Sequence, residues 1–197
     1  MLWDFRQGPP PIIYRSANLE QLRRELTFVE VANPDPKVLT PAHIAHYNEH
    51  GFLAPFRVFI TAEAAENRRV FDRILETAEA SGRDRYSLLN FHLCSAAVYD
   101  ICCNDRILDL VEDLIGPDIV MWSCHCFAKS PHDEKKVPWH QDASYWPFDK
   151  SRTVTAWLAI DDADAENAAM QFLPGTHKMG HLEWEEATEP AARAGRA

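Results

Sequence analysis

The chain has 197 residues, enough for one domain with a buried core, and 46% of them are apolar. Thirty acidic and twenty basic residues give a formal net charge of −10. Because no dense run of lysine or arginine occurs, nucleic acid is excluded as an expected partner. No stretch reaches the roughly 20 apolar residues of a membrane span, and no secretory signal is recognisable. Five cysteines with neither disulfide nor C-x-x-C spacing favour a reduced, cytoplasmic protein.

The first 39 residues differ in composition from the rest of the chain. Five prolines surround one short amphipathic stretch, "LEQLRREL". Proline cannot continue a helix interior or a central strand, so residues 1–39 are predicted to form a loosely attached arm. The compact part of the protein is expected to begin near Thr40.

Three helices are predicted in the part that follows. Thr40 as N-cap, Pro41 at the first helical position and Gly51 as the stop predict a short helix between them. Apolar residues at helical spacing predict a second helix from residue 61 to Gly82, and a third across residues 104–117.

Beyond the third helix the pattern changes to that of strands. Residues 119–129, "IVMWSCHCFAK", and 152–160, "RTVTAWLAI", are rich in β-branched and aromatic side chains. Helices followed by strands predict an α+β fold, in which the helices buttress a β-structure.

The segment "VPWHQDASYW" places His140 and Asp142 one residue apart. In a strand these two side chains would project from the same face and could reach one ion, while Gln141 would point away. Imidazole and carboxylate are two of the three protein ligands that hold non-haem Fe(II) in oxygenases. An H-x-D pattern is a weak signal by itself, and a polar surface turn is the alternative.

The motifs around this pair resemble, in content and order, those of the phytanoyl-CoA dioxygenase family of Fe(II)- and 2-oxoglutarate-dependent oxygenases. "WHQD" is followed by "AWLAIDD", "ENAAM" and "PGTHK", and the earlier "HYNEHGFL" is similar to the family's N-terminal helix and next strand. The resemblance assigns residues 40–186 to a partial dioxygenase domain. It implies a double-stranded β-helix core, also called a jelly-roll or cupin-like fold, buttressed by the N-terminal helices.

The resemblance also implies roles for single residues. His140 and Asp142 would be the Fe(II) ligands and therefore the catalytic pair. Trp157 would line the pocket of the cosubstrate 2-oxoglutarate, and His125 would contact that cosubstrate, with an ordinary core position as the alternative for both. Since Asp142 is present, the implied reaction is hydroxylation.

Aromatic residues flank the proposed ligands. Trp139, Tyr145, Trp146 and Phe148 would form an apolar mouth suited to a small hydrophobic or amphipathic substrate. Simple core packing of these aromatic residues is the alternative interpretation.

The last part of the chain departs from the family pattern. In the family the third iron ligand is a histidine in a later strand, followed by an arginine that binds 2-oxoglutarate. His177 lies in the rim turn "PGTHK", His181 is a poor candidate, and residues 187–197 read as a low-complexity tail. We therefore expect the last strands to be missing and hydroxylation to be impaired. Whether the chain is a fragment of a longer enzyme or a shortened inactive product stays open, as do the substrate and the oligomeric state.

Two other functions remain as alternatives. A non-catalytic binding or scaffold protein could be built on the same partial fold. A zinc-containing, cupin-like isomerase or hydrolase would need further histidines on neighbouring strands, and only His125 is available.

Overall fold

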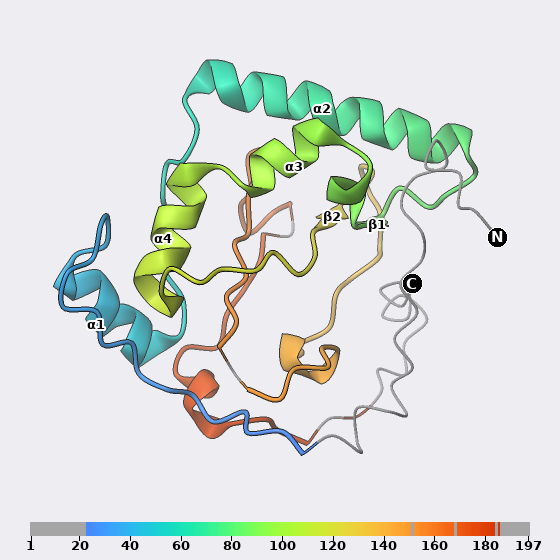
Figure 1. Cartoon of the computed structure of the whole chain (residues 1–197). Coiled ribbons are helices and arrows are strands. Elements are labelled where there is room, and N and C mark those ends of the chain that lie inside the picture. Colours follow the sequence, from blue (N-terminus) through green and yellow to red (C-terminus); the bar gives the residue numbers. More distant parts are fainter. Residues whose placement is uncertain (1–22, 151, 168, 184, 186–197) are drawn as a thin grey trace.

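The structure is a computed structural model that describes residues 23–150, 152–167, 169–183 and 185. The long helix α2 runs along one side of the molecule, over α3 and the β1–β2 pair, and the short 3₁₀ helix η4 lies on the other side (Figure 1). Within the described ranges, no helix combines the length and the apolar character needed to cross a bilayer. In chain order the elements are α1 (Pro41–His50), α2 (Thr61–Ala80), β1 (Ser87–Leu89), η3 (Phe91–Leu93), α3 (Ala96–Cys102), α4 (Asp105–Ile115), β2 (His125–Phe127), η4 (Asp142–Ser144) and η5 (Thr176–Met179).

Helix α1 confirms the prediction made from its end signals. The Thr40 hydroxyl accepts a hydrogen bond from the backbone N–H of His43 at 3.2 Å, and Pro41 occupies the first helical position. Gly51 ends the helix in the left-handed conformation, with φ of 86°, and its N–H donates to the carbonyl of Tyr47 at 2.8 Å. These local bonds satisfy backbone groups that a helix end would otherwise leave unpaired.

Helices α2 and α4 also confirm their predictions. At the start of α2, the Ile60 N–H donates to the Glu63 carboxylate at 2.9 Å. At the start of α4, the Asn104 side chain accepts from the N–H of Arg106 at 3.1 Å, and Gly116 follows its last residue. In both helices, a hydrogen bond between a side chain and a nearby backbone N–H group therefore stabilises the first turn.

The hydrophobic core lies between α2, α3 and the β1–η3 segment. Three of these four elements, β1, η3 and α3, are too short to produce the periodicity on which the helix predictions rest. Their buried residues nevertheless complete the apolar cluster that α2 begins. The cluster comprises Val70, Ile74, Leu75, Ala78, Leu88, Phe91, Val98 and Ile101.

Strand pairing is limited to one antiparallel pair in the part of the chain that the structure describes. β1 pairs with β2, with Leu89 opposite His125. The predicted strand in residues 119–129 is thus found at residues 125–127. The prediction of a strand at residues 152–160 is wrong for the described residues, because no neighbouring strand is hydrogen-bonded to this segment. A β-strand requires such a partner. Helices and strands occur together as an α+β fold requires, but the described residues do not form a jelly-roll.

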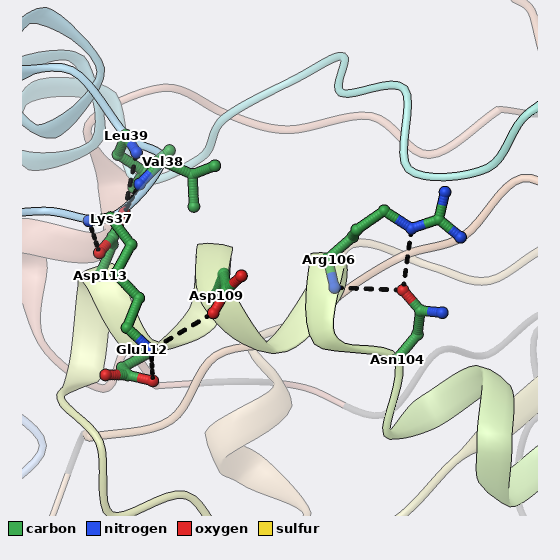
Figure 2. A network of polar contacts seen from close by, with 8 residues as sticks. All are labelled: Lys37, Val38, Leu39, Asn104, Arg106, Asp109, Glu112 and Asp113. Atoms are coloured by element: carbon green, nitrogen blue, oxygen red, sulfur yellow. Dashed lines mark hydrogen bonds and ion pairs between the residues drawn. The ribbon is translucent and has the colours of Figure 1, made fainter.

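Asp113 at the end of α4 anchors the segment that leads into α1. Its carboxylate, 2% exposed, accepts the backbone N–H groups of Lys37, Val38 and Leu39 at 2.7, 2.8 and 2.8 Å (Figure 2). Burial alone would raise the pKa of Asp113, but these three hydrogen bonds outweigh it and hold the pKa below its usual range. Since Leu39 directly precedes the N-cap of α1, this carboxylate anchors the chain on α4 immediately before α1 begins.

A close contact at Gly51 joins the end of α1 to η5. A Cβ atom at Gly51 would lie 2.5 Å from Nδ1 of His177, so no side chain fits there. On the same contact, Nε2 of His177 lies 3.2 Å from the Asn48 carbonyl, and the N–H of Gly175 donates to the carbonyl of His50 at 3.0 Å. The C-terminal end of α1 and residues 175–177 therefore pack closely, through the His177 side chain and one backbone hydrogen bond.

Candidate functional site

His140 and Asp142 do not lie in a strand, contrary to the prediction, yet their side chains meet. His140 lies in irregular chain, and Asp142 is the first residue of η4. Nε2 of His140 is 3.1 Å from Oδ1 of Asp142, and Nδ1 of His140 is 2.7 Å from the carbonyl of Pro138. The turn, rather than the alternation of a strand, brings the imidazole and the carboxylate together.

Each member of this pair stabilises the charged form of the other. The hydrogen bond to Asp142 raises the pKa of His140 against the opposing effect of burial, and the Pro138 carbonyl adds to the rise. Burial would raise the pKa of Asp142, but the hydrogen bonds from His140 and Thr155 outweigh it, so the pKa lies below its ordinary value. Both side chains remain partly open to solvent, with exposed fractions of 32% and 44%. The pair is therefore preformed and accessible.

The geometry of the pair fits two of the three expected metal ligands. Two ligand atoms on adjacent positions of an octahedral ion, each about 2.1 Å from the metal, lie about 3 Å apart. The observed 3.1 Å between Nε2 of His140 and Oδ1 of Asp142 matches this spacing. All nine histidines lie within the described ranges, where no third histidine, cysteine or acidic residue completes a group that could hold a metal. His177 packs on α1, and His181 shares a 2.9 Å hydrogen bond with Ser144.

Two residues without an assigned role hold the pair in place. The hydroxyl of Thr155 donates to Oδ2 of Asp142 at 3.1 Å. The Gln141 side chain ties the turn to a later segment: its Nε2 donates to the Gly180 carbonyl and its Oε1 accepts from the Leu182 N–H, both at 2.8 Å. In the sequence, the threonine pair in "TVTAW" could have indicated a hydrogen-bond partner for Asp142. Threonine is, however, also common in strands that bind nothing.

The segment before α1 supports the same turn from another side. The guanidinium of Arg24 donates to the carbonyl of Ala143 at 2.7 Å and to that of Trp146 at 3.3 Å. Close by, the N–H of Glu25 donates to the carbonyl of Asp149 at 2.7 Å. Of the predicted arm, Arg24 and Glu25 thus contact η4 and the residues that follow it, while residues 1–22 and the predicted tail 187–197 lie outside the described residues.

The structure brings His125 close enough to the pair to interact with it. His125 is the first residue of β2, and part of its side chain reaches solvent. Burial of the rest of the ring lowers the pKa of His125, and the Asp142 carboxylate opposes this shift. Trp157 is 48% exposed, while the next residue, Leu158, packs against the core. Neither His125 nor Trp157 is a fully buried core residue.

The four flanking aromatic residues separate into two kinds. Trp139 and Tyr145 are 62% and 51% exposed, and the Tyr145 ring meets the His140 ring edge to face at 5.6 Å. Trp146 and Phe148 are more buried and pack against each other at 6.0 Å. The first two offer open apolar surface beside the pair, and the last two form its support.

Cysteine thiols line the core side of β2. Cys102, Cys124 and Cys126 all pack against the core cluster. The hydrogen bond from Cys102 lowers the pKa of Cys124 to about 6 against the effect of burial, and Nδ1 of His92 lies 3.2 Å from its sulfur. Burial raises the pKa of Cys126 to about 11.

Comparison with known proteins gives the following relatives. The mouse peroxisomal phytanoyl-CoA dioxygenase is 29% identical over 166 residues, which cover 73% of this chain and 49% of that protein. A probable alpha-ketoglutarate-dependent hypophosphite dioxygenase of Stutzerimonas stutzeri is 30% identical over 89 residues, covering 45% of this chain and 31% of the relative. The ectoine dioxygenase of Nocardia farcinica is 25% identical over 130 residues, covering 64% and 43%. No solved structure gives a significant match.

The chain spans about half or less of the length of these relatives. The family model described as "Phytanoyl-CoA dioxygenase (PhyH)" matches residues 47–195, well over half of the chain, and this range contains the His140–Asp142 pair. The chain belongs to the phytanoyl-CoA dioxygenase family.

Proposed function

We propose that the protein acts as an Fe(II)- and 2-oxoglutarate-dependent dioxygenase that hydroxylates a small hydrophobic or amphipathic molecule at the His140–Asp142 pair. The observation that carries the proposal is the 3.1 Å approach of the imidazole and carboxylate donor atoms on the exposed η4 turn. Family membership supports the same activity, since one relative is named as alpha-ketoglutarate-dependent and others as dioxygenases.

In this proposal each side chain has a separate task. Nε2 of His140 and Oδ1 of Asp142 would hold Fe(II), which when bound would let O2 give one oxygen atom to 2-oxoglutarate, forming succinate and CO2, and the other to a C–H bond of the substrate. Trp157 would flank the cosubstrate, and His125 would donate a hydrogen bond to one of its carboxylates. The open rings of Trp139 and Tyr145 would receive the apolar part of the substrate and exclude water from it.

We further propose weak activity for this chain. The described residues supply two metal ligands, and one fewer protein ligand lowers affinity for the ion. The double-stranded β-helix, or jelly-roll, that the family resemblance implies belongs to the same proposal. The five free cysteines fit a reducing compartment such as the cytoplasm.

An anaerobic titration tests the proposed function. Purified protein receives Fe(II) and then 2-oxoglutarate, and the visible charge-transfer absorption of the bound pair is followed. We expect a weak band at millimolar 2-oxoglutarate that is absent from Asp142→Ala. If the wild-type protein and the variant give identical spectra at every concentration, the pair binds no iron and the proposal is wrong.

A non-catalytic binding or scaffold protein is the second candidate. It is favoured by the absence, within the described residues, of a third ligand beside the pair. In that case the protein would bind neither Fe(II) nor 2-oxoglutarate and would release no succinate. The zinc-enzyme alternative requires the same missing ligands and has no comparable support.

A further inference from the structure

We infer that Thr155 is a positioning residue for the metal site: its hydroxyl holds one oxygen of the Asp142 carboxylate, so that only the other oxygen faces His140 and is offered to a cation. This inference rests on the proposed function. It goes further by assigning the two carboxylate oxygens different tasks and by naming the residue that separates them.

The hydrogen bonds around Asp142 carry the inference. Oδ2 of Asp142 accepts from the hydroxyl of Thr155 at 3.1 Å, while Oδ1 lies 3.1 Å from Nε2 of His140. Because a carboxylate is planar and rigid, fixing Oδ2 also fixes the direction of Oδ1. The binding mode that follows is monodentate, through Oδ1 alone.

The other side of the pair is fixed in the same manner. Nδ1 of His140 is 2.7 Å from the carbonyl of Pro138, which leaves Nε2 as the nitrogen facing Asp142. Partners that orient metal ligands are commonly worth a factor of about 10 to 100 in metal affinity. Thr155 lies 13 positions beyond Asp142, outside the η4 turn, so it supplies this orientation from a separate segment.

Thr155 also stands two positions before Trp157, the residue proposed to flank the cosubstrate. Thr155 and Trp157 are both exposed, so neither is required to fill the core. The hydroxyl of an exposed threonine would otherwise bond to water at little cost. A substitution at Thr155 should therefore change the metal site without unfolding the protein.

The experiment measures the binding of Co(II), an air-stable substitute for Fe(II), by calorimetry with the full chain. Thr155→Val keeps the shape of the side chain but removes the hydroxyl, Thr155→Ser keeps the hydroxyl, and Thr153→Val makes the same change elsewhere on the segment. We expect Thr155→Val to weaken Co(II) binding about 10- to 100-fold. Thr155→Ser and Thr153→Val should bind Co(II) like the wild type. The thermal unfolding midpoint of each metal-free variant is measured alongside, and Thr155→Ala replaces Thr155→Val if that variant unfolds early.

The outcomes separate this inference from the proposed function. If Thr155→Val and Thr155→Ala bind Co(II) as tightly as the wild type, Thr155 positions nothing, while the metal site itself stands. Equal losses in Thr155→Ser and Thr155→Val would likewise overturn the role of the hydroxyl. If the wild type binds no more Co(II) than Asp142→Ala does, both the proposed function and this inference fail.

Discussion

Residues 40–116, the helical region, and residues 117–183, the site region, are built by different kinds of contact. The helical region has capped helices and nearly all of the buried apolar residues, including Ala78 at 1% and Val98 at 2% exposure. No described residue of the site region is buried. Most of the large apolar side chains that are exposed to solvent lie in this region, with Val120 at 87% exposure. Stability and function are therefore expected to reside in different parts of the chain.

The difference arises from how each region satisfies its backbone. A helix pairs its own N–H and C=O groups within a few residues, so the helical region needs little from elsewhere. Strand-like segments need partners that are distant in sequence, and among the described residues of the site region only β2, in a strand pair, and Lys150, in a single bridge with Glu25, have one. Four substitutions test the division between the regions, in decreasing order of their expected effect on stability.

Leu88→Ala should have the largest effect on stability. Leu88 is 3% exposed and packs in the core cluster of the helical region, so its truncation leaves a cavity. We expect a loss of about 2–5 kcal/mol in the free energy of unfolding, measured with denaturant. The matched change Leu173→Ala, at a site-region residue that is 55% exposed, should cost no more than about 0.5 kcal/mol. Similar losses in both variants would remove the distinction between the two regions.

Asp113→Asn should follow, with a loss of about 1.5–3 kcal/mol at pH 7, because the variant weakens charge-assisted hydrogen bonds to three backbone N–H groups. The pKa of Asp113 is lower in the folded protein than the ordinary 3.8. Its contribution is therefore fully present above the unfolded pKa and is lost as the pH falls through the folded pKa. Unfolding curves of the two proteins should converge in acid below that range. A difference that stays constant with pH would mean that charge is not the cause.

Thr40→Ala should cost about 1 kcal/mol, since it removes the N-cap hydroxyl of α1. Thr40→Ser keeps that hydroxyl and should restore most of the loss. Chemical denaturation followed by circular dichroism measures both variants. If serine and alanine are equally destabilising, the methyl group of Thr40 matters rather than the cap.

His140→Ala should have the smallest effect on stability and a large effect on function. The ion pair that it removes is partly exposed, and such pairs contribute about 1 kcal/mol or less. Binding of Fe(II) in the anaerobic titration should nevertheless be lost. If this variant unfolds as readily as Leu88→Ala, the pair is structural, and the site region is not the functional half.

The sequence predicted the features that short-range chemistry determines. Thr40, Pro41 and Gly51 located α1, because each acts on backbone groups within a few residues. The strand assumed around His140 was wrong, because the turn at η4 depends on contacts from Arg24 and Gln141 to residues far along the chain. The proximity of His140 and Asp142 was predicted from the alternation of side chains in a strand, but these residues do not form a strand.

Thr155 shows the same limit at the level of the candidate site. Its bond to Asp142 spans 13 positions, and no local pattern marks which threonine of "TVTAW" will make it. Residues that would touch an ion could be proposed from motif and resemblance. Residues that orient them could be found only once the segments were placed in space.

The contact between Gly51 and His177 has a consequence for how the two regions can vary. Any substitution at Gly51 meets two independent obstacles, a left-handed backbone and an imidazole already occupying the space of the new side chain. Shrinking His177 to alanine would relieve only the second. A saturation library at these two positions should therefore recover almost no pair without glycine at 51. Substitutions are then expected at residue 177 but not at residue 51.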